Sequence, residues 1–450
     1  MNTTLQPGQQ VTGVNGGRSY RIGRSLGAGG QGEVLLASSD GGDVAIKWFF
    51  KRAATPRQRQ IIQKLLTTGA PSAAYLWPSD LLDAPGVEGF GYVMPVRPDA
   101  YVSIDQVRAM RANASLTAIA GACRNLGIAF RALHLKGLAY FDIKGANGFF
   151  DPVNGKVLIC DTDNVTFSGD SAQVAGTITH MAPEIIVGKA KPSTQTDLHS
   201  LAVLLFEMLV RNHPLEGKRQ TAFEVFGSRE KAHLYGRNPV FIFDPANLSN
   251  RPDPAWHRNA TIYWSLLPRF VRERFVAAFT VGLHDPKQRV VESSWIDTFT
   301  GLLDCITPCP RCAAEVYFEP EGATAQGCWS CGNAVPPPRR LLIVDPTRAG
   351  APVLYRIALH AATKHVPATR IYRDHLDPAP ASYDRAEPVA DVVVHPADPR
   401  IIGLVNRTTA TWSMVSSDGQ SQQVPPDSGV SMVDGVEIRF AGSHLVGRVV

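Results

Sequence analysis

The feature that most constrains this chain is a polar run set between two apolar segments. Asp142, Lys144 and Asn147 stand at offsets of zero, two and five, and Asp161 ends an apolar strand fourteen residues after Asn147. Before this run, Leu116–Leu135 repeats apolar residues at a spacing of three to four, which is typical of a helix. The order helix, polar loop and strand ending in a carboxylate predicts a globular domain of mixed helix and strand.

A glycine-rich loop, Leu26–Val34, lies between two segments whose alternating pattern predicts strands. Gly27, Gly29 and Gly32 would let such a hairpin lie close over phosphate groups, because no Cβ blocks the approach. A dinucleotide-binding fold would need a helix directly after the loop, and the sequence predicts a strand there. An ordinary glycine-rich turn is the alternative interpretation.

Lys47 ends an apolar strand thirteen residues after Val34, and in isolation it could be a structural lysine whose charged end reaches solvent. Together, however, the glycine loop, this lysine and the polar run resemble the protein kinase family, with its G-x-G-x-x-G loop, strand lysine and H-R-D-x-K-x-x-N segment. Further segments resemble kinase motifs in the same order: Gly176–Thr177, Met181–Glu184, Asp197–Leu201 and Asp285–Arg289. The resemblance extends from Tyr20 to Phe299 and implies an α+β, two-lobed kinase fold that binds ATP and Mg²⁺.

The resemblance implies a role for each residue of the polar run. Asp142 would orient the hydroxyl that accepts the phosphoryl group, and Lys144 would neutralise the γ-phosphate. Asn147 and Asp161 would hold magnesium, and Lys47 would bind the ATP phosphates. Residues expected to surround the nucleotide are Leu26, Gly27, Gly29, Gly32, Val34, Ala45, Lys47, Met94, Pro95 and Arg97.

The segment Tyr92–Arg97 resembles the strand that enters the hinge between kinase lobes, with Met94 as gatekeeper. Pro95 lacks an N–H, so its carbonyl would accept from the adenine amino group while the N–H of Arg97 donates. An ordinary strand that ends at a proline is the alternative interpretation.

Other motif residues resemble groups that organise the lower kinase lobe. Thr177 favours serine or threonine as the acceptor, because in such kinases it bonds the catalytic aspartate and lysine; a simple turn threonine is the alternative. Asp197 would brace the backbone of the catalytic loop, and Arg289 would form a bidentate pair with Glu184.

Several positions depart from the kinase pattern. Phe141 replaces the arginine that grips a phosphorylated activation loop, which predicts activity without phosphorylation of that loop. Tyr140 replaces the usual histidine, an exchange of one aromatic ring for another. Thr162 and Asp163 replace the Phe-Gly of the D-F-G motif, and the extra carboxylate of Asp163 could serve a metal or a structural hydrogen bond.

The segment Pro56–Leu66 reads as a helix but contains no acidic residue, so the usual glutamate partner of Lys47 is absent from it. Gln60 or Gln63 could make a weaker neutral contact, or Asp80 could reach in from the next segment. The sequence leaves these alternatives open.

Two C-x-x-C pairs are separated by fifteen residues, a spacing that lets four thiolates meet around one Zn²⁺ ion. The expected ligands are Cys309, Cys312, Cys328 and Cys331. Because a small ribbon lacks a core, the metal would supply its folding energy. A spacer or protein-contact role is expected for this ribbon, with nucleic-acid contact as the alternative.

Residues 341–450 carry short alternating strands. Gly403–Arg407, Trp412 and Asp434–Phe440 resemble the second half of forkhead-associated (FHA) domains, which are β-sandwiches that bind phosphothreonine. The resemblance implies a small all-β FHA-like domain, but the Gly-Arg and Ser-x-x-His half of the phosphopeptide motif is not found.

The bulk properties exclude several classes of protein. A net charge of +5 is small for 450 residues and makes nucleic acid an unlikely partner. The N-terminus has no basic segment followed by an apolar core, and no apolar run reaches the roughly 18 residues of a membrane span. Four of the seven cysteines lie in the two C-x-x-C pairs, which indicates metal binding in a reducing compartment. We therefore expect a cytoplasmic protein that does not contact membranes.

The predicted order is a flexible N-terminus (1–18), a kinase N-lobe (19–97) and C-lobe (98–304), a zinc ribbon (305–334), a linker (335–340) and the FHA-like domain (341–450). Asp161–Asn164, Trp77–Asp80 and Phe90–Pro95, with the cysteine-rich tail, resemble a group of bacterial kinases. That group is found with a von Willebrand A protein and a metal-dependent phosphatase in tellurite-resistance-type gene sets, which implies a substrate and an opposing phosphatase.

The sequence thus predicts an ATP- and Mg-dependent kinase acting on serine or threonine of a protein partner. The alternative is a pseudokinase scaffold that binds nucleotide and acts through its ribbon and β domain. A nucleic-acid-binding ribbon regulated by the kinase fold is a third interpretation.

Overall fold

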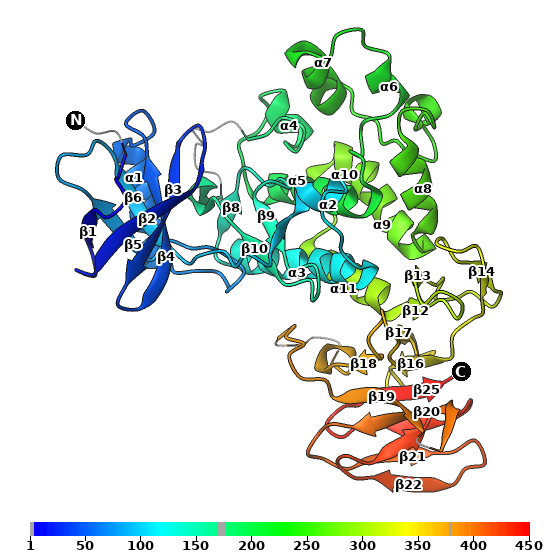
Figure 1. Ribbon diagram of the computed structural model, residues 1–450. Helices are drawn as coiled ribbons and strands as arrows, with labels where there is room; N and C mark the ends of the chain where they lie inside the picture. Colours follow the sequence, from blue (N-terminus) through cyan, green and yellow to red (C-terminus); the bar gives the residue numbers. More distant parts are fainter. Residues whose placement is uncertain (1–3, 169–175, 378–379, 381, 396) are drawn as a thin grey trace. The chain divides into compact units, whose positions relative to one another are not determined.

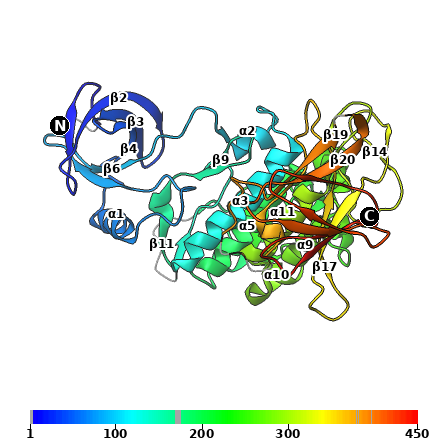
Figure 2. The same ribbon diagram turned by 90° about the horizontal axis from the view of Figure 1, so that it is seen from below.

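The computed structural model describes residues 4–168, 176–377, 380, 382–395 and 397–450. The chain splits into two compact units that interleave along the sequence (Figure 1, Figure 2). Unit 1 comprises Met1–Ala114, Asn125–Thr261 and Phe275–Trp295. Unit 2 comprises Ser115–Arg124, Ile262–Arg274 and Ile296–Val450.

Unit 1 begins with a closed barrel of strand order β1-β2-β3-β4-β6-β5, coloured blue in Figure 1. The strands are β1 (Gln10–Gly13), β2 (Ser19–Ala28), β3 (Gly32–Ser39), β4 (Gly42–Phe49), β5 (Asp80–Asp83) and β6 (Phe90–Met94). Alternate residues of the strands face one core, which contains Tyr20, Ile22, Leu35, Ile46 and Trp48.

Part of the N-terminal segment that the sequence assigned as flexible, residues 1–18, is a strand of this barrel. β1 pairs with β2 and with β5, and Leu5 and Val11 are each 3% exposed. These apolar side chains enter the barrel core, which explains why the segment is ordered despite its polar composition. Residues 1–3 lie outside the described part of the chain.

Helix α1 (Pro56–Thr68) follows β4. It begins at Thr55, whose side chain accepts a hydrogen bond from the N–H of Gln58, and Pro56 takes the first helical position, where no N–H is required. The helix buries Ile62 and Leu65. Its apolar face therefore anchors it, and its polar face remains available for contacts with neighbouring turns.

The remainder of unit 1 is mainly helical, with short strands around the candidate site. The strands are β7 (Val102–Ser103), β8 (Leu138–Tyr140), β9 (Gly148–Phe150), β10 (Val157–Ile159) and β11 (Val165–Phe167). They form a β10-β9-β7 sheet and a β11-β8 pair. Helix α5 (Thr194–Val210) begins with a capping box at Ser193 and is almost entirely apolar from residue 201 to residue 210, and most of its residues are buried.

The other helices of the chain are short or contribute residues to both units. The short ones are α2 (Ile104–Arg108), α4 (Pro183–Ile186), α6 (Lys218–Thr221), α7 (Ser228–Ala232) and α10 (Val281–His284), with the turns η2 (His233–Arg237), η3 (Leu248–Asn250) and η4 (Pro286–Gln288). The shared ones are α3 (Leu116–Leu135), α8 (Arg258–Leu266), α9 (Arg269–Phe279) and α11 (Glu292–Asp304). Across the described ranges, none of the helices combines the length and apolar character needed to cross a bilayer.

The C-terminal region of unit 2 is sheet-rich. Two hairpins come first, β12 (Ile306–Pro308) with β13 (Glu315–Tyr317) and β14 (Gln326–Gly327) with β15 (Ala334–Val335). A six-stranded sheet of order β17-β16-β25-β24-β21-β22 and a four-stranded sheet of order β18-β19-β20-β23 follow. Their bounds are β16 (Arg340–Val344), β17 (Val353–Ala358), β18 (Arg370–Ile371), β19 (Ala390–His395), β20 (Asp398–Asn406), β21 (Trp412–Val415), β22 (Ser421–Val424), β23 (Gly429–Ser431), β24 (Glu437–Arg439) and β25 (Val446–Val449).

Both sheets contribute to one hydrophobic core. Leu341 of β16 and Ile438 of β24 come from the larger sheet, and Leu404 of β20 comes from the smaller. The rings of Trp412 and Phe440 meet edge-on with centroids 5.1 Å apart. Two sheets that share a core in this way form a layered β structure.

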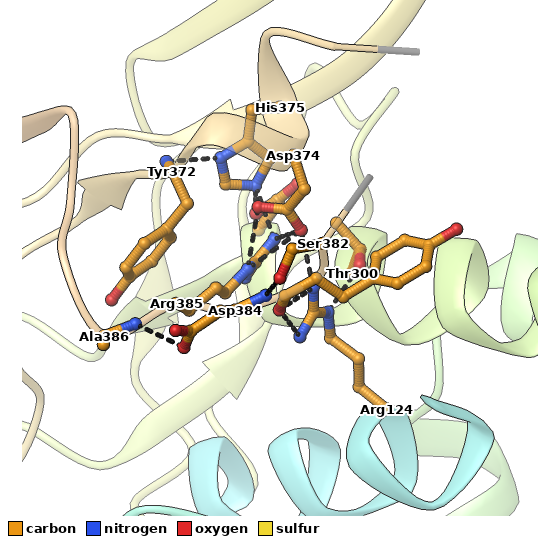
Figure 3. Close-up of polar contacts among 11 residues, drawn as sticks. Arg124, Thr300, Tyr372, Asp374, His375, Ser382, Asp384, Arg385 and Ala386 are labelled. Carbon is orange, nitrogen blue, oxygen red and sulfur yellow. Dashed lines mark hydrogen bonds and ion pairs between the residues drawn. The ribbon is translucent and has the colours of Figure 1, made fainter. Parts of the chain in front are cut away.

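Unit 2 also contains a buried set of charges, which we call the arginine cluster: Arg124, Thr300, Asp374 and Arg385 (Figure 3). Asp374 lies in the turn η5 (Arg373–His375). Nη2 of Arg124 donates to Asp374 Oδ2 at 2.6 Å, and Arg385 donates to both oxygens of the same carboxylate. The side chains of Arg124 and Asp374 are each 3% exposed, so the cluster ties α3 to η5 inside unit 2.

Candidate active site

The polar run predicted from the sequence closes around the carboxylate of Asp142. Lys144 Nζ donates to Oδ2 at 2.5 Å, and Thr177 donates to Oδ1 from its hydroxyl at 2.8 Å and from its N–H at 3.0 Å. Asn147 Nδ2 donates to the carbonyl of Asp142 at 2.9 Å. Burial alone would raise the pKa of the Asp142 carboxyl, but the bonds from Lys144 and Thr177 hold it below its usual range. The carboxylate is therefore ionised and fixed in one orientation.

The hairpin of β9 and β10 brings the two expected magnesium ligands together. Gly148 pairs with Ile159, and the N–H of Cys160 donates to the carbonyl of Asn147 at 3.0 Å. Asp161, the next residue, has a side chain that is 40% exposed. A carboxylate oxygen and an amide oxygen are the hard ligands that magnesium prefers, so the residues present fit this metal.

Lys47 lies in β4, where it pairs with Val34 of β3 and Tyr92 of β6. Its Nζ lies 2.7 Å from Asp163 Oδ1 and 3.2 Å from Asp161 Oδ1. Burial would lower the pKa of Lys47, but the charges of Asp163 and then Asp161 raise it above its ordinary value. The lysine is therefore buried and charged, and we call Lys47, Asp161, Asp163 and Tyr92 the lysine cluster.

Within the described structure, none of the three residues that the sequence suggested as partners of Lys47 supplies the negative charge beside it. Gln60 and Gln63 are exposed on α1, because they fall on the side of the helix opposite Ile62 and Leu65. Asp80 instead accepts two backbone N–H groups of the loop after β1, at 3.0 and 3.3 Å. These expectations are corrected by the structure, which places the carboxylate of Asp163 beside the lysine.

Two further residues of the site were not found by sequence reasoning. The hydroxyl of Tyr92 donates to Asp163 Oδ1 at 3.0 Å, and Nε2 of Gln58 donates to the carbonyl of Asp163 at 3.3 Å. Tyr92 is fully buried in β6, and burial followed by the charge of Asp163 raises its pKa well above the usual value. The sequence showed Asp163 as an extra carboxylate, but it did not show that Tyr92 and Gln58 would bond to this residue.

The turn that carries Asp163 is η1 (Thr162–Asn164). Asp161 precedes it with φ of 51°, a left-handed conformation that is uncommon for non-glycine residues but that aspartate adopts more readily than most. Thr162 is fully buried and donates to the carbonyl of Leu76 at 3.2 Å. At the position where kinases carry the phenylalanine of D-F-G, this chain therefore uses a hydrogen bond to hold the turn.

A second charged group supports the backbone of the catalytic loop. Asp197 of α5 accepts from the N–H of Tyr140 at 2.6 Å and from His134 Nε2 at 3.1 Å, and His134 Nδ1 also contacts Glu292. Burial raises the pKa of Asp197 to about 6. Burial would lower the pKa of His134, but the two carboxylates raise it to about 9. The expected bracing role of Asp197 is confirmed by these contacts.

The expected pair between Arg289 and Glu184 is also present. Nη1 and Nη2 of Arg289 donate to the two oxygens of Glu184, each at 2.8 Å, and the arginine side chain is 2% exposed. Such a fork-to-fork geometry fixes both side chains.

The residues expected around a nucleotide lie on neighbouring strands and loops. Val34 pairs with Lys47, and Ala45 pairs with Met94, which is 5% exposed. Pro95 is exposed directly after β6, and Arg97 directs its guanidinium to the carbonyl of Tyr101 at 2.6 Å. Leu26, Gly27 and Gly29 lie at the exposed end of the β2–β3 hairpin.

The three glycines of this hairpin differ in what a side chain at each position would meet. A Cβ at Gly27 or Gly29 would meet nothing within 4 Å, so both leave open space above the hairpin. A Cβ at Gly32 would lie 2.2 Å from the carbonyl oxygen of Trp48. Gly32 therefore serves the close approach of β3 and β4, whereas no contact in the described structure requires glycine at 27 or 29.

The four cysteines of the C-x-x-C pairs form one cluster in unit 2. Their Sγ atoms all lie within 4.8 Å of one another, and the Cys309–Cys331 and Cys312–Cys328 pairs are each 3.7 Å apart. Tetrahedral zinc with Zn–S bonds of about 2.3 Å requires S···S separations of roughly 3.8 Å, so the four thiols fit this ion.

Each of the two C-x-x-C turns repeats the same backbone bonds. The N–H of the residue after the second cysteine donates to the carbonyl of the first, from Ala313 to Cys309 and from Gly332 to Cys328, each at 2.9 Å. Both donors have positive φ, 57° and 69°. This repeat explains how two short turns present four sulfurs to one point.

Comparison with known proteins identifies the class to which the site belongs. The protein kinase domain model matches residues 101–247, which contain Asp142, Lys144, Asn147 and Asp161. The chain therefore contains a protein kinase domain.

The individual relatives carry the names of kinases, and two of the three described next are named serine/threonine-protein kinases. The chain is 35% identical over 85 residues to serine/threonine-protein kinase sck2 of Schizosaccharomyces pombe, which covers 18% of this chain and 13% of that protein. It is 38% identical over 109 residues to ribosomal protein S6 kinase alpha-4 of Mus musculus, covering 22% and 14%. It is 24% identical over 223 residues to serine/threonine-protein kinase mos of Gallus gallus, covering 43% and 63%. The chain spans less than two thirds of each of these proteins, and together they support a serine/threonine kinase.

Proposed function

We propose that the chain is an ATP- and Mg-dependent protein kinase that transfers the γ-phosphate to serine or threonine of a protein partner. The observation that carries this proposal is the carboxylate of Asp142, ionised and held by Lys144 and Thr177 inside the matched kinase domain. Phosphoryl transfer needs little covalent chemistry from a protein; it needs a carboxylate to orient the hydroxyl, a cation beside the transferred group and oxygen ligands for a metal.

In this mechanism each residue has a defined task. Asp142 accepts the hydrogen bond of the acceptor hydroxyl, and its lowered pKa keeps it ionised at neutral pH. Lys144 places its ammonium beside the oxygens that gain charge. The amide nitrogen of Asn147 donates to the carbonyl of Asp142, so its amide oxygen is available to bind magnesium together with Asp161. Magnesium, when bound, neutralises charge on the phosphates.

The direct test is transfer of labelled γ-phosphate from ATP to the chain itself and to a generic protein acceptor. Asp142→Asn should lower the rate by about 10²–10⁴-fold, the range that a positioned proton acceptor contributes. Equal transfer by the variant and the wild type would refute the role of Asp142.

A pseudokinase scaffold is the second candidate function. It is favoured by one observation, the absence of any acidic residue in α1. If ATP raises the melting temperature of the wild type but no acceptor is phosphorylated, including the chain itself, the scaffold is supported instead.

We also propose that activity does not require phosphorylation of the activation loop. Phe141 stands where kinases carry the arginine that would bind such a phosphate. Residues 169–175 of this loop lie outside the described part of the chain. Treatment with a phosphatase that is then removed should leave the initial rate unchanged; a loss that recovers on incubation with ATP would contradict the proposal.

The four-cysteine cluster is proposed to hold one structural zinc ion. Its support is the match between the sulfur separations and tetrahedral geometry. Metal analysis should give about one zinc per chain for the wild type and none for Cys328→Ser combined with Cys331→Ser. Wild-type protein that contains no zinc after purification without chelators would refute it.

The remaining proposals rest on sequence patterns or on resemblance. We propose an FHA-like identity for residues 341–450, a cytoplasmic location, and the predicted domain boundaries from residue 19 onward. A von Willebrand A protein is the candidate substrate, and a metal-dependent phosphatase is the candidate antagonist. Transfer of phosphate to the von Willebrand A protein, reversed by the phosphatase, would support both assignments. Transfer to unrelated acceptors at the same rate would contradict the proposed substrate specificity.

A further inference from the structure

Lys47 is a buried cation whose charge must be compensated inside unit 1. Its side chain is 8% exposed, and an ammonium group withdrawn from water is stable only when it is paired. Helix α1, which in kinases supplies the partner, has the sequence PRQRQIIQKLLTT and offers no carboxylate. The compensating charges come instead from Asp161 and Asp163, on either side of Thr162 in η1.

The two aspartates differ in what else they can do. Asp161 is 40% exposed and follows Cys160, whose N–H donates to the carbonyl of Asn147, so its carboxylate can face a metal ion. Asp163 is 1% exposed and lies closer to the lysine, at 2.7 Å against 3.2 Å. If Asp161 binds a metal ion, Asp163 is therefore the carboxylate that still pairs with Lys47.

Asp163 is itself held in position from several sides. Its Oδ1 accepts the hydroxyl of Tyr92 at 3.0 Å, and its carbonyl accepts the side-chain amide of Gln58 at 3.3 Å. The left-handed residue Asp161 and the buried bond of Thr162 to Leu76 set the turn that carries it. A side chain fixed by its neighbours in this way can fix the lysine in turn.

We propose that Asp163, oriented by Tyr92, is the residue that positions Lys47 for the phosphates of ATP in place of a helix carboxylate. The proposal rests on the kinase function proposed above and names a positioning residue of that same site. Its consequence is that the placement of Lys47 depends on the turn after Asp161. Helix α1 contacts this turn through a neutral amide, that of Gln58, and offers no carboxylate.

The first test needs no nucleotide and no catalysis. Because removal of a carboxylate lowers the pKa of a paired lysine, Asp163→Asn should leave more Lys47 in the reactive neutral form. Acetylation of the full-length protein by acetic anhydride at pH 8, followed by mass spectrometry of the Lys47 peptide, should be at least about tenfold faster than in the wild type. Asp83→Asn is the matched control, since it removes a carboxylate that pairs with Arg59 of α1 on the surface. A Lys47 rate that is equal in Asp163→Asn and the wild type overturns the proposal.

The second test measures ATP use. Asp163→Asn should raise KM for ATP and lower kcat/KM by about 10–100-fold, and Asp83→Asn should leave both unchanged. Adding Gln58→Glu to Asp163→Asn returns a carboxylate beside this turn, from helix α1, and should recover about tenfold of the loss. If Asp163→Asn loses kcat/KM as expected but the double variant recovers none of it, Asp163 acts by holding the turn, and a role for its charge is contradicted.

A third variant makes a smaller change, so that a loss of ATP use can be told apart from a folding defect. Tyr92→Phe keeps every charge and removes only the hydroxyl that orients Asp163. It should raise KM for ATP about threefold to tenfold, and an unchanged KM would overturn the orienting role of Tyr92. If the wild type transfers no phosphate at all, the kinase function fails, and the acetylation rate of Lys47 still decides the role of Asp163.

Discussion

The lysine cluster of unit 1 and the arginine cluster of unit 2 are both built from buried ion pairs, but they differ in what remains unpaired. In the arginine cluster, both oxygens of Asp374 accept N–H groups, and Arg124 also donates to the hydroxyl of Thr300 and the carbonyl of Tyr383 (Figure 3). In the lysine cluster, Oδ2 of Asp163 has no partner in the residues that the structure describes, and Asp161 is 40% exposed.

This difference separates a cluster that stabilises a fold from one that serves a ligand. A network whose groups are all satisfied holds one arrangement, because any change leaves a buried charge without a partner. A network with an exposed carboxylate and a spare carboxylate oxygen has bonding capacity left for a metal ion or a hydrogen-bond donor. We infer that the arginine cluster contributes stability and the lysine cluster contributes nucleotide binding.

The largest expected effect falls on the arginine cluster. Asp374→Ala would leave Arg124 buried without its counter-charge, which should lower the free energy of unfolding by about 3–5 kcal/mol. Denaturant unfolding of the full chain measures this change. The matched control is Asp434→Ala, whose carboxylate is 72% exposed and pairs with Arg339; it should cost about 0.5 kcal/mol or less. Similar losses in the two variants would show that the arginine cluster is not special.

The next effect concerns the bracing group of His134, Asp197 and Glu292, which is buried like the arginine cluster but titratable. The pKa of His134 is raised from about 6.5 to about 9, so its contribution is fully present below pH 6.5 and is lost as the pH rises through 9. The stability advantage of the wild type over His134→Gln should therefore shrink by up to about 3 kcal/mol across this range. Unfolding curves from pH 6 to 10 measure it, and a constant difference would contradict the assignment.

The smallest effects come from removing one hydroxyl in each cluster. Thr300→Val removes the acceptor of Arg124 Nε and should cost about 1 kcal/mol of stability without changing KM for ATP. Tyr92→Phe should change KM for ATP instead, as stated above. Melting temperatures and ATP titrations on both variants separate the two outcomes. A KM change in Thr300→Val would remove the distinction between the clusters.

The parts of the site that were predicted from the sequence are those set by local chain geometry. Asp142, Lys144 and Asn147 lie within one loop, so their spacing fixes which groups meet. The C-x-x-C turns are local in the same sense, because each repeats one backbone bond pattern. The short strands beyond residue 340 could be predicted from their period-two pattern. Their division between two sheets could not be predicted, because sheet order depends on long-range pairing.

The partner of Lys47 could not be predicted, because it depends on contacts between distant segments. Asp163 lies 116 residues after Lys47 and reaches it only through the left-handed turn at Asp161. Tyr92 was assigned to a hinge strand, and nothing in the pattern showed which way its hydroxyl points. The interleaving of the units has the same cause, since Arg124 meets Asp374 across 250 residues.

The most direct test of this account is the affinity for ATP, measured side by side in Asp163→Asn and Asp374→Asn at a temperature where both are folded. We predict that Asp163→Asn binds ATP at least about tenfold more weakly than the wild type, while Asp374→Asn keeps wild-type affinity despite its lower stability. Wild-type affinity in Asp163→Asn, or an equal loss in both variants, would contradict the separation of the two clusters.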